Sequence, residues 1–227
     1  MAEIFRDLRA ITKYVLDRGT NGAYADPVRY DRLQEQWFSR RPELARGTAE
    51  VVTAFIKPNG KICEAAAGTG ILSLQLAERG FHVTCTDIQR NALEHLQNKA
   101  KEKGLEERIV TSVIDMNRPF PLEENTYDGV VQLRANRYIV GNTFYTEFYR
   151  ILKKGGKALL STFTIDQLLW WKNAGRKQHT TPEGIVSDLI EAGFKEVQRY
   201  KAKEIFSANN IKVPPYYVPS QFLVARK

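Results

Sequence analysis

Three acidic residues each stand where a predicted strand ends, and this shared position is the strongest chemical signal in the chain. Glu64, Asp87 and Asp115 follow three successive apolar runs that have the length of buried strands. In a doubly wound sheet, ligands bind at the carboxyl ends of the strands, so these side chains are expected at one edge. A carboxylate accepts two hydrogen bonds, which is what the cis-diol of a ribose requires. One such acid could be a helix N-cap or a loop residue, but three in succession favour a ligand site.

A loop of very small residues joins the first of these strands to a helix. It reads Glu64-Ala65-Ala66-Ala67-Gly68-Thr69-Gly70, and the helix begins directly after it. Single methyl groups or missing β-carbons let a ligand approach the backbone, and the first amides of the helix point toward it. Asp87 follows Gly70 by roughly the 20 residues that are typical of an acid binding ribose hydroxyls. Alone, the loop could be an ordinary turn; together with the acids it predicts a nucleotide-type site.

The elements that must position these residues alternate between strands and helices from Lys61 onward. Strands are predicted at residues 61–64, 81–87, 108–114, 127–133, 157–163, 195–200 and 220–225. Helical periodicity predicts helices that begin near residues 71, 91, 144 and 181. This alternation is typical of a parallel sheet covered by helices on both faces. The last two strands are separated only by a predicted loop, 201–219, so we expect them to pair antiparallel.

Residues 1–58 contain no alternating pattern and are predicted to form a helical N-terminal cap. Apolar residues recur at helical spacing over 3–17, and further helices are predicted over 28–37 and from Pro42 onward. We expect this cap to act as a lid on a core formed by residues 59–227. With 227 residues, cap and core together suit a single domain.

Composition restricts the compartment and the partners. No apolar run could cross a bilayer, and the first residues lack the features of a secretory signal. Cys63 and Cys85 are the only cysteines, both in predicted strands, which indicates buried thiols in a reducing compartment and hence the cytoplasm. The net charge of +8 could serve nucleic acid, but dispersed lysines and arginines favour a solvated basic surface. We predict no membrane partner and no metal ion; the oligomeric state stays open.

Over residues 45–227, the chain resembles the class I S-adenosyl-L-methionine-dependent methyltransferases. The loop 64–70 is similar to the family's acid followed by G-x-G, and Asp87 matches its ribose-binding acid. Residues 114–131 resemble the stretch that holds the adenine amino group, and residues 152–157 resemble the turn into the fifth strand. The resemblance implies an α/β, doubly wound, Rossmann-like sheet of seven strands, mostly parallel with an antiparallel last strand.

The resemblance also implies the cofactor, S-adenosyl-L-methionine, with S-adenosyl-L-homocysteine as product. The positions that match the family's cofactor site are Glu64, Ala65, Ala66, Gly68, Thr69, Gly70, Asp87, Ile88, Asp115, Met116 and Leu133. One of them departs from the family pattern, because glycine usually stands at the position of Ala66. Alanine fits there if its φ is negative, at the expense of room beside the methionine part of the cofactor. A shifted cofactor pose or an inactive binding homologue are the alternatives that this residue leaves open.

The resemblance implies methyl transfer, and our leading hypothesis for the acceptor is a nitrogen or oxygen of a small molecule. A methyl group on a sulfonium is intrinsically reactive, so the protein mainly has to align an acceptor for in-line attack, by proximity and orientation. A general base is needed only if the acceptor binds in its protonated form. The catalytic residues are therefore not predicted firmly; the candidates are His179, Arg134, Arg137 and Tyr30.

The acceptor is expected between the cap and the loops after the fourth and fifth strands. Aromatic and polar residues there are candidates for contacting it, although each could equally pack in the core or face solvent. The candidates are Tyr14, Tyr24, Tyr30, Arg134, Asn136, Tyr138 and Trp170.

Other functions remain open on the sequence alone. An RNA or protein methyltransferase could use the basic surface, but no aromatic–basic motif supports one. A NAD-dependent oxidoreductase would need a third glycine where Ser73 stands. A homologue that binds S-adenosylmethionine without turnover is the fourth reading.

Overall fold

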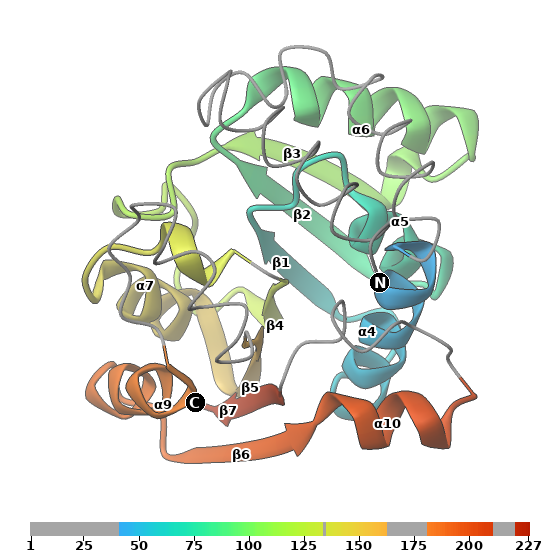
Figure 1. Cartoon of the computed structure of the whole chain (residues 1–227). Coiled ribbons are helices and arrows are strands. Elements are labelled where there is room, and N and C mark those ends of the chain that lie inside the picture. The colour runs from blue at the N-terminus through green and yellow to red at the C-terminus, as the bar shows by residue number, and fades with distance from the viewer. Residues whose placement is uncertain (1–40, 134, 163–180, 211–220) are drawn as a thin grey trace, which may run out of the picture.

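A single seven-stranded sheet organises the computed structural model, which describes residues 41–133, 135–162, 181–210 and 221–227. Its spatial order is β3-β2-β1-β4-β5-β7-β6 (Figure 1). The strands are β1 (Lys61–Ala65), β2 (His82–Asp87), β3 (Ile109–Val113), β4 (Tyr127–Gln132), β5 (Leu152–Ser161), β6 (Glu196–Lys201) and β7 (Gln221–Arg226). Six strands run in one direction, and only β7 runs opposite to them. The predicted doubly wound, Rossmann-like fold with an antiparallel last strand is confirmed.

Helices cover both faces of the sheet because neighbouring residues of each strand point to opposite sides. On one face, Ile62, Val131 and Leu159 share a buried cluster with residues of the helices before and after β1 and β2. On the other face, Cys63 and Leu160 share a cluster with the helices that flank β5. The helices of the first face are α4 (Arg41–Phe55), α5 (Ile71–Glu78), α6 (Arg90–Glu102) and α10 (Ala202–Ala208); those of the second are α7 (Thr143–Ile151) and α9 (Pro182–Glu191). Short 3-10 turns, η1 (Glu106–Arg108) and η2 (Asn136–Tyr138), precede β3 and α7.

Two elements differ from the prediction. The strand expected over 157–163 begins five residues earlier, and the turn expected at 153–156 is an irregularity within it, since the pairing with β4 jumps between Leu152 and Lys157. Gly155 allows this irregularity because glycine adopts its φ of 78° without steric cost. The predicted loop 201–219 contains α10, a helix too short to be stable alone. Phe206 holds it on the sheet, with its ring 6.0 Å from that of Phe222.

Other predictions of the sequence lie partly beyond these ranges. The helices expected at 3–17 and 28–37 fall outside the described residues, whereas the third predicted helix of the cap is α4. Both cysteines are free and buried, as predicted. Among the described residues, no helix has the length and apolar character of a membrane span.

Candidate cofactor site

The small-residue loop after β1 is folded tightly against β2 and α6. The amide of Ala67 donates to the carbonyl oxygen of Thr86 at 2.9 Å, and the amide of Gly70 donates to that of Ala67 at 3.0 Å. Gly70 has φ 76°, and a β-carbon there would lie 2.2 Å from Leu96 Cδ1. Glycine is therefore required at this position by both backbone conformation and space. The loop is thus a rigid surface at the carboxyl end of β1.

Ala66 adopts a left-handed backbone conformation, so it does not meet the condition under which alanine was expected to replace glycine without strain. Its φ is +55°, whereas that expectation required a negative φ. For a residue with a β-carbon, this conformation costs about 1–2 kcal/mol. The amides of the next two residues, Ala67 and Gly68, donate to Thr86 and Asp87 of β2, and these bonds hold the loop in place despite this cost. Such strain is typical of loops whose shape serves a ligand.

Asp87 joins the loop to the end of β2. Its Oδ2 accepts a hydrogen bond from the amide of Gly68 at 2.8 Å, and its Oδ1 accepts from that of Gln89 at 2.9 Å. The side chain is 7% exposed, and burial raises the pKa of the carboxyl, although the backbone bonds oppose this. A carboxylate offers about four lone-pair positions, so it can still accept from a diol. The neighbouring Ile88 is 56% exposed and offers an apolar surface at the same rim.

Glu64 and Thr69 are two further polar residues of the segment 64–70, one at its start and one near its end. Glu64 is buried, and Ser73 Oγ donates to its Oε2 at 2.5 Å, so α5 holds this carboxylate. Thr69 Oγ1 is buried and has no hydrogen-bond partner among the described residues. Buried polar groups are nearly always paired, so this orphan hydroxyl within the loop fits a site that a polar ligand completes.

The segment after β3 brings a second carboxylate to the same edge. The amide of Ile114 donates to the carbonyl oxygen of Asp87 at 3.0 Å, which ties the two strand ends together. Asp115 is half-buried, and its Oδ1 accepts from the amide of Asn117 at 2.9 Å. Met116 is half-buried against the second core cluster. Glu64, Asp87 and Asp115 therefore lie at the ends of three adjacent strands, as the sequence predicted.

The loop after β4 carries one predicted cofactor residue, Leu133, and the predicted acceptor residues that the structure describes. Leu133 packs on the first core cluster, and η2 contains Asn136, which is buried, and Tyr138, which is half-buried. Arg137 belongs to η2, but its side chain is not described. Six further candidates lie outside the described residues: Tyr14, Tyr24, Tyr30, Arg134, Trp170 and His179.

Sequence reasoning missed several polar groups of this region. At the ends of β4 and β5 lie three buried side chains with neutral hydrogen-bonding groups, those of Gln132, Ser161 and Thr162. The spacing of apolar residues along the sequence predicts which face of a strand is buried. It does not predict that a polar residue at the end of a strand is buried as well. Asn117 was also missed, although an asparagine two residues after Asp115 is typical of a turn at a strand end.

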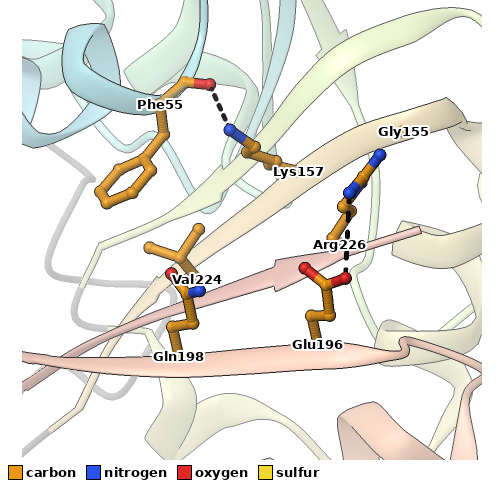
Figure 2. A pocket seen from close by; sticks show the side chains of 7 residues that line it. All are labelled: Phe55, Gly155, Lys157, Glu196, Gln198, Val224 and Arg226. Atoms are coloured by element: carbon orange, nitrogen blue, oxygen red, sulfur yellow. Dashed lines mark hydrogen bonds and ion pairs between the residues drawn. The ribbon is translucent and has the colours of Figure 1, made fainter.

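A separate hollow lies at the opposite edge of the sheet, near the starts of β5 and β6. It has a volume of about 340 Å³ and is lined by Phe55, Gly155, Lys157, Glu196, Gln198, Val224 and Arg226 (Figure 2). Its charged groups are already engaged, because Lys157 Nζ donates to the carbonyl oxygen of Phe55 at 3.0 Å and Arg226 pairs with Glu196 at 3.8 Å. The carboxyl edge, with its loop, acids and orphan hydroxyl, is therefore the candidate site.

Comparison with known proteins agrees with this geometry. Residues 62–156 match the family model described as Methyltransferase domain. An S-adenosyl-L-methionine-dependent Diels-Alderase of Talaromyces variabilis, iccD, is 30% identical over 106 residues, which cover 44% of this chain and 35% of that protein. The ubiquinone/menaquinone biosynthesis C-methyltransferase UbiE of Allorhizobium ampelinum is 30% identical over 112 residues, covering 48% of this chain and 43% of UbiE.

Among solved structures, a candidate S-adenosyl-L-methionine-dependent methyltransferase of Methanococcus maripaludis is similar, with a TM-score of 0.66. It is 20% identical, and the match covers 88% of this chain and 91% of that one, so the likeness concerns the fold. The chain spans less than half the length of the curated relatives named above. The family model covers β1 to the start of β5, which includes the loop and all three acids. Residues 62–156 are thus similar to a methyltransferase domain, and the chain shares its fold with a solved structure described as a candidate S-adenosyl-L-methionine-dependent methyltransferase.

Proposed function

We propose that the chain binds S-adenosyl-L-methionine at the carboxyl edge and transfers its methyl group to a small-molecule acceptor. The observation that carries the proposal is the pair formed by the Gly68 amide and the Asp87 carboxylate, with Ile88 exposed beside it. Asp87 would accept from the ribose hydroxyls, Ile88 would pack on the adenine, and Asp115 would accept from its amino group. The orphan hydroxyl of Thr69 supports a polar ligand at the loop. When bound, the cofactor supplies a methyl group on a positively charged sulfur.

The residues of this chain contribute orientation more than acid–base chemistry in this proposal. The loop 64–70 and Asp87 hold the cofactor, and η2 holds the acceptor, so that the two reactants are aligned. Proximity and orientation can supply about 7–11 kcal/mol of the barrier reduction. His179, Arg134, Arg137 and Tyr30 stay candidates for a base or an acceptor contact, to be tested by substitution.

The acceptor is proposed to be a small molecule with a nitrogen, oxygen or carbon nucleophile. The described residues at the ends of β4 and β5 on the acceptor side, Gln132, Ser161 and Thr162, are buried and neutral, and such enclosed surroundings suit a small polar compound. The carbon nucleophile is added because the UbiE relative is a C-methyltransferase. Of the predicted cap 1–58, α4 packs on the first face of the sheet. We therefore propose that residues 1–40 cap the acceptor side, that α4 and residues 59–227 form the core of one domain, and that the protein is cytoplasmic.

A second candidate function is a rearrangement or cyclisation that uses S-adenosyl-L-methionine as a bound group without transferring its methyl. The similarity to a Diels-Alderase that depends on S-adenosyl-L-methionine favours it. Methylation of RNA or protein by way of the basic surface is a third candidate, with less support.

Calorimetric titration with S-adenosyl-L-methionine, S-adenosyl-L-homocysteine and NAD tests the cofactor. Binding of the first two in the micromolar range is expected, and binding of NAD alone would overturn the proposal. Turnover is then tested with cofactor carrying a labelled methyl group and an extract of small molecules. Label in a small molecule supports methyl transfer to a small molecule. Cofactor binding with no label in any small molecule favours the second or the third candidate, and added RNA and protein then distinguish these two.

A further inference from the structure

We propose that Asn117 is a positioning residue that couples the cofactor side of the site to the acceptor side. Its Nδ2 donates to the carbonyl oxygen of Tyr138 at 2.9 Å, and its Oδ1 accepts from the amide of Val140 at 2.7 Å. One side chain thus connects the segment after β3 with the segment after β4. We call this pair of hydrogen bonds the Asn117 bridge. The inference rests on the proposed function, which assigns these two segments to the cofactor and to the acceptor.

The bridge requires both ends of an amide side chain. A carbonyl oxygen faces Nδ2 and an amide hydrogen faces Oδ1, so only one orientation of the group satisfies both partners. Aspartate at position 117 could accept from Val140 but would oppose the carbonyl of Tyr138, and alanine could do neither. Since Asn117 is only half-buried, the bridge is not needed to fill the core.

The cofactor side of the bridge is held by Asp115. The amide of Asn117 donates to Asp115 Oδ1 at 2.9 Å, and the amide of Arg118 donates to the carbonyl oxygen of Asp115 at 3.0 Å. Ile114 in turn donates to the carbonyl oxygen of Asp87. A ligand that holds both carboxylates therefore restricts the turn that presents the Asn117 amide. The hydrogen bonds form a continuous connection from the ribose-side acid to the loop after β4.

The acceptor side of the bridge consists of η2 and the next two residues, Ile139 and Val140. Tyr138 ends η2, and the same turn contains the buried Asn136. Binding of the cofactor is therefore expected to stabilise the acceptor loop before an acceptor arrives. By thermodynamic linkage, an acceptor that binds this loop must raise the affinity for the cofactor by the same factor.

Amide hydrogen exchange of the full chain, with and without S-adenosyl-L-homocysteine, tests this coupling. In the unchanged protein, the ligand should slow exchange about fivefold or more in two segments, 66–70 and 136–140. In Asn117→Ala, the ligand should bind with an affinity within about threefold and still protect 66–70, but protection of 136–140 should be lost. Asn117→Asp should restore the protection of Val140 in the free protein, because it keeps that acceptor.

Asn125→Asp is the matched control. Asn125 lies on the same connection between β3 and β4, but its Oδ1 accepts from Lys227 Nζ at 2.9 Å, away from η2. This variant should respond to the ligand like the unchanged protein. Equal ligand-dependent protection of 136–140 in the unchanged protein and in Asn117→Ala would overturn the inference, as would protection of 66–70 alone in the unchanged protein. If the ligand does not bind at all, the proposed cofactor fails first. Should Asn117→Ala unfold, Asn117→Asp carries the test.

Discussion

The two halves of the carboxyl edge are built differently. At the ends of β1, β2 and β3, main-chain amides hold the site, with Gly68 bonded to Asp87 and Ile114 bonded to the carbonyl of the same residue. At the ends of β4 and β5, buried side chains provide the polar groups, and the Asn117 bridge crosses between loops. The half held by its backbone needs small residues at fixed positions. The half held by side chains can use different residue types at these positions.

The largest effect is expected in the backbone-held half, at Gly70. Gly70→Ala adds a β-carbon that would collide with Leu96 and would have to adopt φ 76°. We expect the free energy of unfolding to fall by about 2–4 kcal/mol, measured by urea denaturation. Gly104→Ala is the control, because Gly104 has φ 65° but open space around its β-carbon, so only about 1–2 kcal/mol should be lost. Equal losses would show that packing of the loop on α6 is unimportant.

Asp87→Asn tests whether this half binds the cofactor. The amide keeps the size of the side chain and can still accept one backbone hydrogen bond, but it loses the charge and part of the acceptor capacity. Binding of S-adenosyl-L-homocysteine should weaken by about 1–3 kcal/mol in calorimetry. Asp128→Asn is the control, since Asp128 also accepts from a backbone amide, that of Lys61, but at the opposite edge. Unchanged affinity in a folded Asp87→Asn variant would exclude Asp87 as the ribose ligand.

The pH dependence of cofactor binding is a second test of the Asp87 carboxylate. Burial raises the pKa of Asp87, so it takes up a proton at a higher pH than an ordinary aspartate. Ribose hydroxyls donate to the ionised form, so affinity should fall as the pH is lowered through this raised pKa. Stability should change in the opposite sense: the contribution of Asp87 is lost as the pH rises from the ordinary pKa through the raised one. Both dependences should be absent in Asp87→Asn, and their persistence there would assign them to another group.

Tyr138→Phe tests the half held by side chains. Removing the Tyr138 hydroxyl should leave the affinity for S-adenosyl-L-homocysteine unchanged. Methyl transfer should slow roughly fivefold, which corresponds to the loss of about 1 kcal/mol for one hydrogen bond. Tyr149→Phe, on α7 and packed against Phe194, is the control and should retain full transfer. A weaker cofactor affinity in Tyr138→Phe would show that the two halves do not divide the work in this way.

The smallest effect is expected at Ala66. Ala66→Gly relieves the cost of φ +55°, but glycine also makes the unfolded chain more flexible. The free energy of unfolding should rise by about 0.5–1 kcal/mol. Binding of S-adenosyl-L-homocysteine should become tighter because the methyl group is removed from the loop. A decrease in stability would mean that the half-buried methyl group contributes packing that outweighs its strain.

The order of the elements and the positions of the acids could be predicted from the sequence. Alternating apolar runs, the loop 64–70 and acids after three strands are local patterns, and local patterns determine strands, helices and tight turns. Two local predictions were wrong for a physical reason. β5 begins at Leu152 because β4 offers a partner to its backbone, and α10 forms because Phe206 packs against Phe222.

By itself, the sequence determined the fold class, the loop and the residues that place carboxylates at one edge. Only the tertiary structure decided the left-handed φ of Ala66, the bonds of Asp87 to Gly68 and Gln89, and the bridge from Asn117 to the loop after β4. Strand and turn patterns depend on neighbours in the chain, whereas these features depend on segments that meet only after the sheet has formed. The division of the edge into a backbone-held half and a half held by side chains is therefore a property of the folded chain.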